Sequence, residues 1–238
     1  MHPRVAPPVA VLFDVGNTLL AEDRFDLRAG IRAVVPADER LVAALAREFE
    51  HAARAAIAEQ REISLADWLV RRASRGDGFA LGAPVHALED AIWRAVVRLV
   101  PRPGALAMLH RLREDGVPTA AVSNAAFSGR VLGAELARHG FGGLLEFTLS
   151  SADIGRRKPA AALFEVALGQ LGTDPGRTWF VGDTLADDIA GAAAAGLMPI
   201  WLQQGGGDVS SEVPAVHIPD WGALLRLYED ARSSAPAG

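Results

Sequence analysis

The chain has 238 residues, of which 50% are hydrophobic and 22% are charged, and its formal net charge is −5. This composition is typical of a globular protein with a sizeable core, and the acidic balance argues against nucleic-acid or acidic-membrane partners, because no basic surplus is left for phosphates. The absence of cysteine excludes disulfides, zinc thiolate sites and thiol catalysis.

The N-terminal stretch lacks the positive start and long apolar run of a signal peptide. No segment approaches the roughly 18 uncharged apolar residues that a membrane span needs. We therefore expect a cytoplasmic protein without a membrane partner. The sequence predicts no particular oligomeric state.

Short apolar runs recur along the chain at the length of buried strands. Each is rich in valine, leucine or phenylalanine, which is typical of strands covered on both faces. The runs lie at Val9–Phe13, Thr119–Val122, Leu145–Leu149, Thr178–Val181, Pro199–Leu202 and Ala215–Ile218.

Helix-like stretches of about ten residues or more separate most of these runs. They lie at Ala105–Glu114, Ser128–His139, Ala160–Leu171, Asp187–Ala195 and Trp221–Ala231. Alternation of strand and helix favours parallel pairing with right-handed crossovers. The sequence therefore predicts an α/β fold with an open, doubly wound parallel sheet.

One long interval, from about Glu22 to Val100, contains no convincing strand and has a helical pattern instead. Apolar residues recur at helical spacing over residues 38–60, and two further helices are predicted at Leu65–Arg72 and Val85–Leu99. We predict a core domain of residues 1–20 and 101–238, with a helical lid of residues 21–100. The lid should open and close about hinges near Leu19–Glu22 and Pro101–Gly104.

Polar side chains that could take part in catalysis or ligand binding follow several of the predicted strands. Taken singly, each has an ordinary structural explanation, such as a helix cap or a turn. In doubly wound sheets, however, ligands bind beyond the carboxyl ends of the strands, so the set together predicts a functional site. The set comprises Asp14, Ser123, Asn124, Lys158 (the only lysine of the chain), Asp183, Asp187 and Asp188.

Four segments in this order resemble the motifs of the haloacid dehalogenase-like (HAD) hydrolase superfamily, in the branch whose helical cap follows the first motif. They are FDVGNTLL, VSN, RRKP with ALFEVALGQLG, and VGDTLADDIAGAAAAG. The resemblance extends from about Val9 to Leu202. It implies a Rossmann-like HAD core with a helical cap domain.

The resemblance also implies roles for individual residues. Asp14 would attack phosphorus to form an aspartyl-phosphate, and Lys158 would stabilise the developing negative charge. A Mg²⁺ ion would relieve the repulsion among the clustered carboxylates. The implied phosphate-binding residues are Thr18, Ser123, Asn124 and Lys158, and the implied metal ligands are Asp14, the carbonyl of Gly16 and Asp183, supported by Asp187 and Asp188.

Gly16 is the main departure from the motif. Phosphatases of this family usually carry a second aspartate there, which acts as general acid and base and is worth roughly 10²–10⁴-fold in rate. Glycine cannot supply a proton, so another acid, such as Glu22 or Asp23, or water would have to replace it. Good leaving groups such as acyl phosphates would need the acid least.

Three other functions are alternatives to a Mg²⁺-dependent phosphatase acting on a small phosphorylated metabolite. A 2-haloacid dehalogenase needs no leaving-group proton, but that branch usually has an aromatic residue at position 16 and no acidic cluster. A phosphonate-cleaving relative needs a lid lysine, which this chain lacks. A non-catalytic binding module would have been free to lose Asp14 and Lys158. The residues therefore favour the phosphatase.

Two remaining features are expected to have structural roles and no part in catalysis. The lid tryptophans, Trp68 and Trp93, are expected to pack in a core, with contact to the substrate as the alternative. GGG at 205–207 lacks the lysine of a nucleotide-binding loop and is expected to form a turn.

Overall fold

The computed structural model describes residues 5–76, 78–203 and 213–234, so the GGG stretch at 205–207 lies outside the described residues. Its centre is a six-stranded sheet in which every neighbouring pair is parallel, in the order β5-β4-β1-β6-β7-β8. The doubly wound sheet is thereby confirmed. The strands are β1 (Ala10–Phe13), β4 (Thr119–Ser123), β5 (Thr148–Ser150), β6 (Thr178–Gly182), β7 (Met198–Leu202) and β8 (Val216–Ile218).

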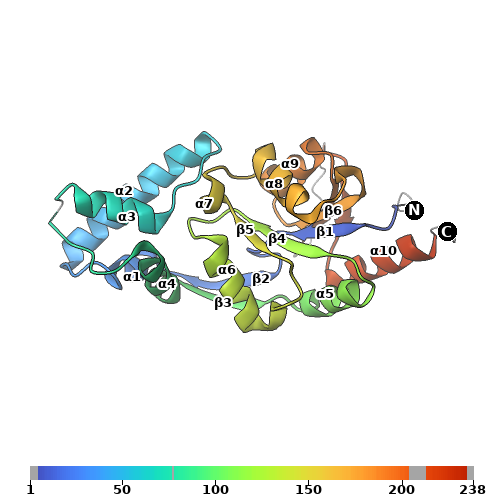
Figure 1. Ribbon diagram of the computed structural model, residues 1–238, viewed down its shortest axis with the longest axis horizontal. Helices are drawn as coiled ribbons and strands as arrows, with labels where there is room; N and C mark the ends of the chain where they lie inside the picture. The colour runs from blue at the N-terminus through green and yellow to red at the C-terminus, as the bar shows by residue number, and fades with distance from the viewer. Residues whose placement is uncertain (1–4, 77, 204–212, 235–238) are drawn as a thin grey trace.

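Helices cover both faces of the sheet (Figure 1). Successive side chains of a strand point to opposite faces, so Val11 and Phe13 pack in the cluster with α5 and α10, whereas Leu12 packs with α8 and α9. The helices of this part are α5 (Ala105–Glu114), α6 (Gly129–Leu136), α7 (Ser151–Ile154), α8 (Ala161–Leu171), α9 (Ala190–Ala194) and α10 (Trp221–Ser233).

Three elements of the core differ from the sequence-based expectation. The strand expected from Leu145 begins only at Thr148, because Leu144 and Leu145 lie in a turn and contribute their apolar side chains to the core from there. The helix after β4 continues past Leu136 into a π-helical segment, η1 (Ala137–Phe141). The helix expected from Asp187 begins with another π-helical segment, η3 (Leu185–Ile189), and a 3-10 turn, η2 (Pro175–Arg177), precedes β6.

Four helices between β1 and α5 gather at the end of the molecule opposite the two termini (Figure 1). Their apolar faces form a second core, and Asp38 and Ser64 cap the starts of two of them through side-chain hydrogen bonds to backbone N–H groups. They are α1 (Leu27–Arg32), α2 (Glu39–Ala58), α3 (Leu65–Ser74) and α4 (Val85–Val96). Among the described residues, no helix has both the length and the apolar character required to cross a bilayer.

The expectation of a strand-free interval after residue 22 was wrong. Strand β2 (Leu20–Phe25) pairs antiparallel with β3 (Val97–Pro101), and the third predicted lid helix ends at Val96 instead of Leu99. The four residues after Ala21 in β2 are exposed, so no buried apolar pattern announces the strand. Since Leu20 pairs with Pro101, the two predicted hinges lie side by side on this ladder. Hinge motion and the division into domains stay predictions.

Candidate active site

The predicted polar residues converge at the carboxyl ends of β1, β4 and β6. In chain order the sheet strands are arranged 3-2-1-4-5-6, so the switch point, where ligands bind in such sheets, lies between β1 and β6. Asp14 follows β1 and Asp183 follows β6 at this point. A cavity of about 220 Å³ opens there, lined by Asp14, Gly16, Asn17, Ser123, Asn124, Arg157, Lys158, Asp183, Thr184, Asp187 and Asp188.

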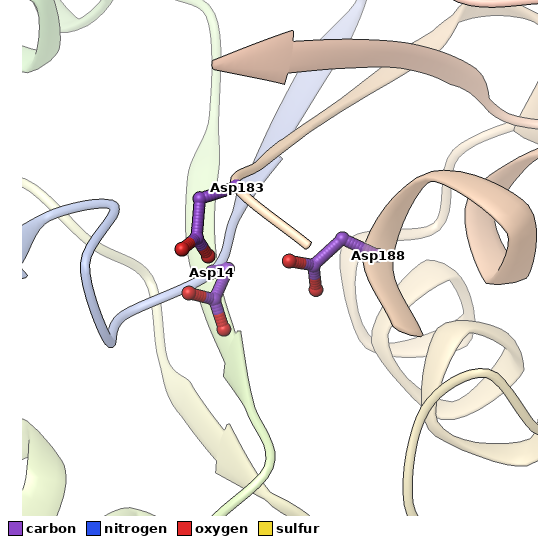
Figure 2. Close-up of side chains that lie close together, drawn as sticks. All are labelled: Asp14, Asp183 and Asp188. Atoms are coloured by element: carbon purple, nitrogen blue, oxygen red, sulfur yellow. The ribbon is translucent and has the colours of Figure 1, made fainter. Parts of the chain in front are cut away.

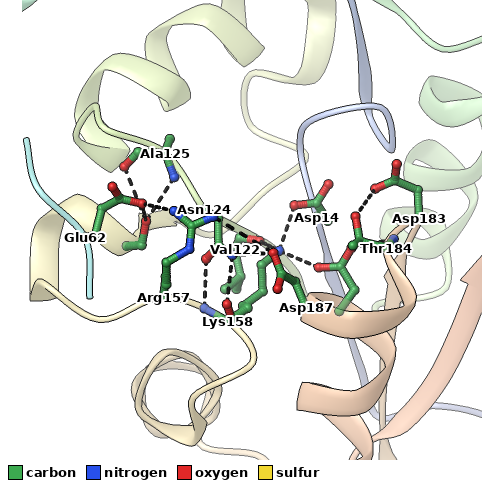
Figure 3. A network of polar contacts seen from close by, with 12 residues as sticks. Asp14, Glu62, Val122, Asn124, Ala125, Arg157, Lys158, Asp183, Thr184 and Asp187 are labelled. Atoms are coloured by element: carbon green, nitrogen blue, oxygen red, sulfur yellow. Dashed lines mark hydrogen bonds and ion pairs between the residues drawn. The ribbon is translucent and has the colours of Figure 1, made fainter. Parts of the chain in front are cut away.

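Lys158 is the centre of the site, although it is only 1% exposed. Its Nζ lies 2.7 Å from Oδ1 of Asp14 and 2.7 Å from Oδ1 of Asp188, and it donates to the carbonyl of Val122 at 2.9 Å (Figure 3). Burial by itself would lower the pKa of the ammonium, but the two carboxylates outweigh burial and raise that pKa above its ordinary value. Lys158 is therefore a permanent positive charge under the cavity.

Among the carboxyl groups of the site, that of Asp14 has the most strongly shifted pKa. Burial raises its pKa from 3.8 to about 7; Lys158 opposes this rise, and the negative charges of Asp188 and Asp183 add to it. One ammonium is thus shared between two carboxylates while a third lies nearby. The cluster carries more negative charge than the protein itself neutralises.

Asp14, Asp183 and Asp188 form a compact carboxylate cluster (Figure 2). One oxygen from each lies within 4.8 Å of the others. The close position of Asp188 depends on Gly182, because a Cβ on that residue would lie 2.5 Å from Cγ of Asp188. The backbone N–H of Thr184 donates to Oδ2 of Asp188 at 3.0 Å and holds the carboxylate in place.

The cluster fits a hard divalent cation. Carboxylate oxygens are the ligands that Mg²⁺ and Ca²⁺ prefer. Burial, with repulsion from Asp188 added to it, raises the pKa of Asp14 and that of Asp183, and a bound cation would offset both effects. The third carboxylate is Asp188, whereas its neighbour Asp187 accepts from Nδ2 of Asn124 at 3.2 Å.

Asn124 positions Lys158. Its Oδ1 accepts from the backbone N–H of Lys158 at 2.8 Å, and its Nδ2 donates to the carbonyl of the same residue at 3.0 Å. These two bonds engage both ends of the side-chain amide. The predicted contact of Asn124 with a phosphoryl group stays a prediction.

The remaining predicted residues lie in different environments. Ser123 and Gly16 both line the cavity, and a Cβ built on Gly16 would meet no atom within 4 Å, so the first side-chain atom would have room there. Thr18 is fully buried and does not line the cavity, and its hydroxyl oxygen has no hydrogen-bond partner among the described residues. The structure therefore does not bring Thr18 to the site.

One contact between the helical part and the site was not predicted from the sequence. Glu62, between α2 and α3, accepts from Nη1 of Arg157 at 2.8 Å and from Oγ of Ser151 at 2.8 Å (Figure 3). Its backbone N–H donates to the carbonyl of Gly155 at 3.1 Å. Glu62 and Arg157 are 95 residues apart, so no local pattern could pair them, although Arg157 adjoins Lys158 in the RRKP motif.

Curated relatives of this chain include several phosphatases. The ribulose-1,5-bisphosphate 5-phosphatase of Halopiger xanaduensis is 33% identical over 152 residues, or 63% of this chain and 58% of that protein. The glyceraldehyde 3-phosphate phosphatase of Methanopyrus kandleri is 31% identical over 209 residues, or 82% of this chain and 84% of that protein. The match thus spans little more than half of the Halopiger protein but most of the Methanopyrus protein.

Solved structures with the same fold include a dehalogenase crystallised as an intermediate complex. It has a TM-score of 0.62 and 22% sequence identity, covering 94% of this chain and 98% of that chain, and this likeness concerns the fold alone. The family model described as haloacid dehalogenase-like hydrolase matches residues 9–196. The chain belongs to the haloacid dehalogenase-like hydrolase family.

Proposed function

We propose that this protein is a Mg²⁺-dependent phosphatase that works through an aspartyl-phosphate at Asp14. The observation that carries the proposal is the buried ammonium of Lys158, 2.7 Å from Asp14 and 2.7 Å from Asp188, beneath a polar cavity. A fixed positive charge beside a carboxylate nucleophile suits a reaction in which negative charge accumulates on transferred oxygens.

In the proposed reaction, an oxygen of Asp14 attacks phosphorus while the bond from phosphorus to the leaving oxygen breaks. Water then attacks the phosphorus of the aspartyl-phosphate, which releases inorganic phosphate and restores the carboxylate. Lys158 holds the nucleophile in place and stabilises the charge of the phosphoryl oxygens, and Ser123, which lines the cavity, would donate to them.

Mg²⁺ would be held by carboxylates of the cluster, Asp14 and Asp183 with Asp188 in support, together with the carbonyl of Gly16. When bound, it supplies positive charge that neutralises the phosphoryl group and the cluster. The raised pKa of Asp14 supports this assignment, as do the cluster oxygens, which all lie within 4.8 Å of one another.

Small phosphorylated metabolites are the proposed substrates, because the curated relatives are named as phosphatases of such compounds. The carboxylate cluster favours a phosphatase over a dehalogenase, since displacement of a halide needs no cation among the acids. A non-catalytic binding module would not require a buried lysine, whose desolvation costs free energy.

A substrate screen tests the proposal. The parent and an Asp14→Asn variant are incubated with phosphate esters, acyl phosphates and 2-haloacids, with Mg²⁺ and with a chelator. We expect release of phosphate only by the parent and only with Mg²⁺. Halide release independent of metal would indicate a dehalogenase, and inactivity on every substrate without Mg²⁺ binding would indicate a binding module.

A further inference from the structure

A second cavity, of about 310 Å³, adjoins the carboxylate site between the sheet and the helical part. The two cavities share Gly16, Asn17, Ser123, Asn124 and Arg157, so a group leaving phosphorus near Asp14 would enter the second one. We call it the leaving-group cavity.

The walls of the leaving-group cavity are largely apolar. Trp93 and Phe127 stand edge to face there, with ring centroids 4.9 Å apart. The indole N–H of Trp93 donates to Glu135 at 3.0 Å, so its one polar atom is already paired and the ring offers apolar surface. Edge-to-face geometry of this kind also suits a third aromatic ring.

Exposed apolar side chains border the same cavity. Among the described residues, four large hydrophobic side chains are notably exposed, and two of them, Phe25 at 53% and Ile57 at 45%, line the leaving-group cavity. Apolar side chains that stay exposed around a concave site mark a surface that a ligand covers.

The described residues that line the cavity offer no free positive charge for an anionic ligand. Of the described residues that line it, Arg157 is the one basic side chain, and it is paired with Glu62 at 2.8 Å. Glu22 adds a negative charge to the same wall. A carboxylate on the leaving group would lose water without gaining a partner, which is costly.

Gly16 restricts the acidity of the leaving group, independently of the apolar walls of the cavity. With no general acid at position 16, and with Glu22, the candidate replacement on the cavity wall, exposed on β2, the leaving oxygen departs as an anion and takes its proton from water afterwards. A phenol, with a pKa of about 10, does so far more readily than an aliphatic alcohol, whose acidity is close to that of water at roughly 15.7.

We propose that the preferred substrate is the phosphate monoester of an uncharged phenol, an aryl phosphate, an assignment that rests on the proposed phosphatase function. Asp14 bonds to phosphorus, the phosphorus–oxygen bond to the ring breaks, and the phenolate leaves with the electron pair. Its oxygen lies at the polar carboxylate site, where solvent protonates it, and its ring lies in the apolar cavity. Water then cleaves the aspartyl-phosphate.

Three esters separate charge from leaving-group acidity: phenyl phosphate, 4-carboxyphenyl phosphate and cyclohexyl phosphate. With Mg²⁺ present, kcat/KM for phenyl phosphate should exceed that of the carboxylated ester by at least about tenfold, because the added anion finds no partner. Cyclohexyl phosphate should have a lower kcat/KM still. Gly16→Asp, whose Cβ would meet no atom within 4 Å, should reduce the ratio of kcat/KM for phenyl phosphate to that for cyclohexyl phosphate by about tenfold or more.

Variants of the cavity rim complete the test. Phe25→Ser and Ile57→Ser should each raise KM for phenyl phosphate several-fold and change KM for the carboxylated ester less than about twofold. Val85→Ser is the matched control, since Val85 is an exposed hydrophobic residue at 37% that does not line the cavity.

Equal kcat/KM for the charged and uncharged aryl esters, or rim variants that behave like Val85→Ser, would overturn this proposal and leave the phosphatase function intact. Absence of hydrolysis of every phosphate ester would overturn the phosphatase function, and the proposal with it.

Discussion

Replacing Lys158 by methionine removes the ammonium and keeps a side chain of similar length. The substitution strands two buried carboxylates, Asp14 and Asp188, each of which had its oxygen 2.7 Å from Nζ. It also removes the donor to the carbonyl of Val122. Removing one partner of a buried ion pair lowers the free energy of unfolding by about 3–5 kcal/mol. Two pairs are broken here, but Asp14 can take up a proton and lose its charge, which keeps the total loss near this range.

The free energy of unfolding is measured by urea titration at pH 8 without metal. With a slope near 3 kcal/mol per molar urea, the midpoint of Lys158→Met should fall by about 1–2 M. Arg156→Met is the matched control, because Arg156 is an exposed basic residue two positions earlier, and its loss should change stability by less than about 0.5 kcal/mol.

A double-mutant cycle checks the cause. In an Asp14→Asn background one of the two stranded charges is already gone, so Lys158→Met should cost about 1–2 kcal/mol less than in the parent. At pH 5, below the raised pKa of Asp14 of about 7, the cost of Lys158→Met in the parent should also shrink. A free energy of unfolding for Lys158→Met within about 1 kcal/mol of that of the parent at pH 8 would refute the reasoning.

Three further outcomes are expected. Burial and neighbouring carboxylates raise the pKa of Asp14 from 3.8 to about 7, so the stability that Asp14 contributes is complete below pH 3.8 and is lost as the pH rises through 7. Asp14→Asn should therefore raise the urea midpoint at pH 8 without metal but not at pH 3.8. Equal midpoints for parent and variant at pH 8 would contradict this expectation. Arginines of α10 and α5 hold the pKa of Asp115 well below its usual range, so the stability that Asp115 contributes is present above about pH 3.9 and is lost in more acidic solution. Asp115→Asn should therefore lower the free energy of unfolding by about 1–2 kcal/mol at pH 7, measured by thermal unfolding. A destabilisation that stays the same below about pH 3.9 would exclude the ion pair as its cause. Gly182→Ala, whose Cβ would lie 2.5 Å from Cγ of Asp188, should cost about 1–3 kcal/mol, whereas Gly16→Ala, with no atom within 4 Å, should cost less than about 0.5 kcal/mol; equal losses would contradict the packing argument.

The sheet and the position of the site could be predicted because both follow from short-range patterns. A run such as VLF in β1 is apolar on both faces only if both faces are covered, which indicates a parallel sheet between helix layers. Parallel strands place their carboxyl ends on one edge, so Asp14 and Asp183 had to lie near each other.

What the sequence could not predict depends on contacts between distant residues. Strand β2 has the sequence LAEDRF, which is too polar to read as a strand, and forms by pairing with β3 more than seventy residues later. The choice of Asp188 over Asp187 as the third carboxylate depends on the π-helical turn and on the space left by Gly182. The pairing of Glu62 with Arg157 has no local signal at all.

The central claim is that Asp14 is the attacking group. The most direct test is acid quenching of the protein during turnover of phenyl phosphate with Mg²⁺, followed by mass spectrometry of its peptides. We predict a single phosphoryl group on Asp14, absent from Asp14→Asn, which should also be inactive. Turnover by Asp14→Asn, or a phosphoryl group on any other residue, would contradict the account.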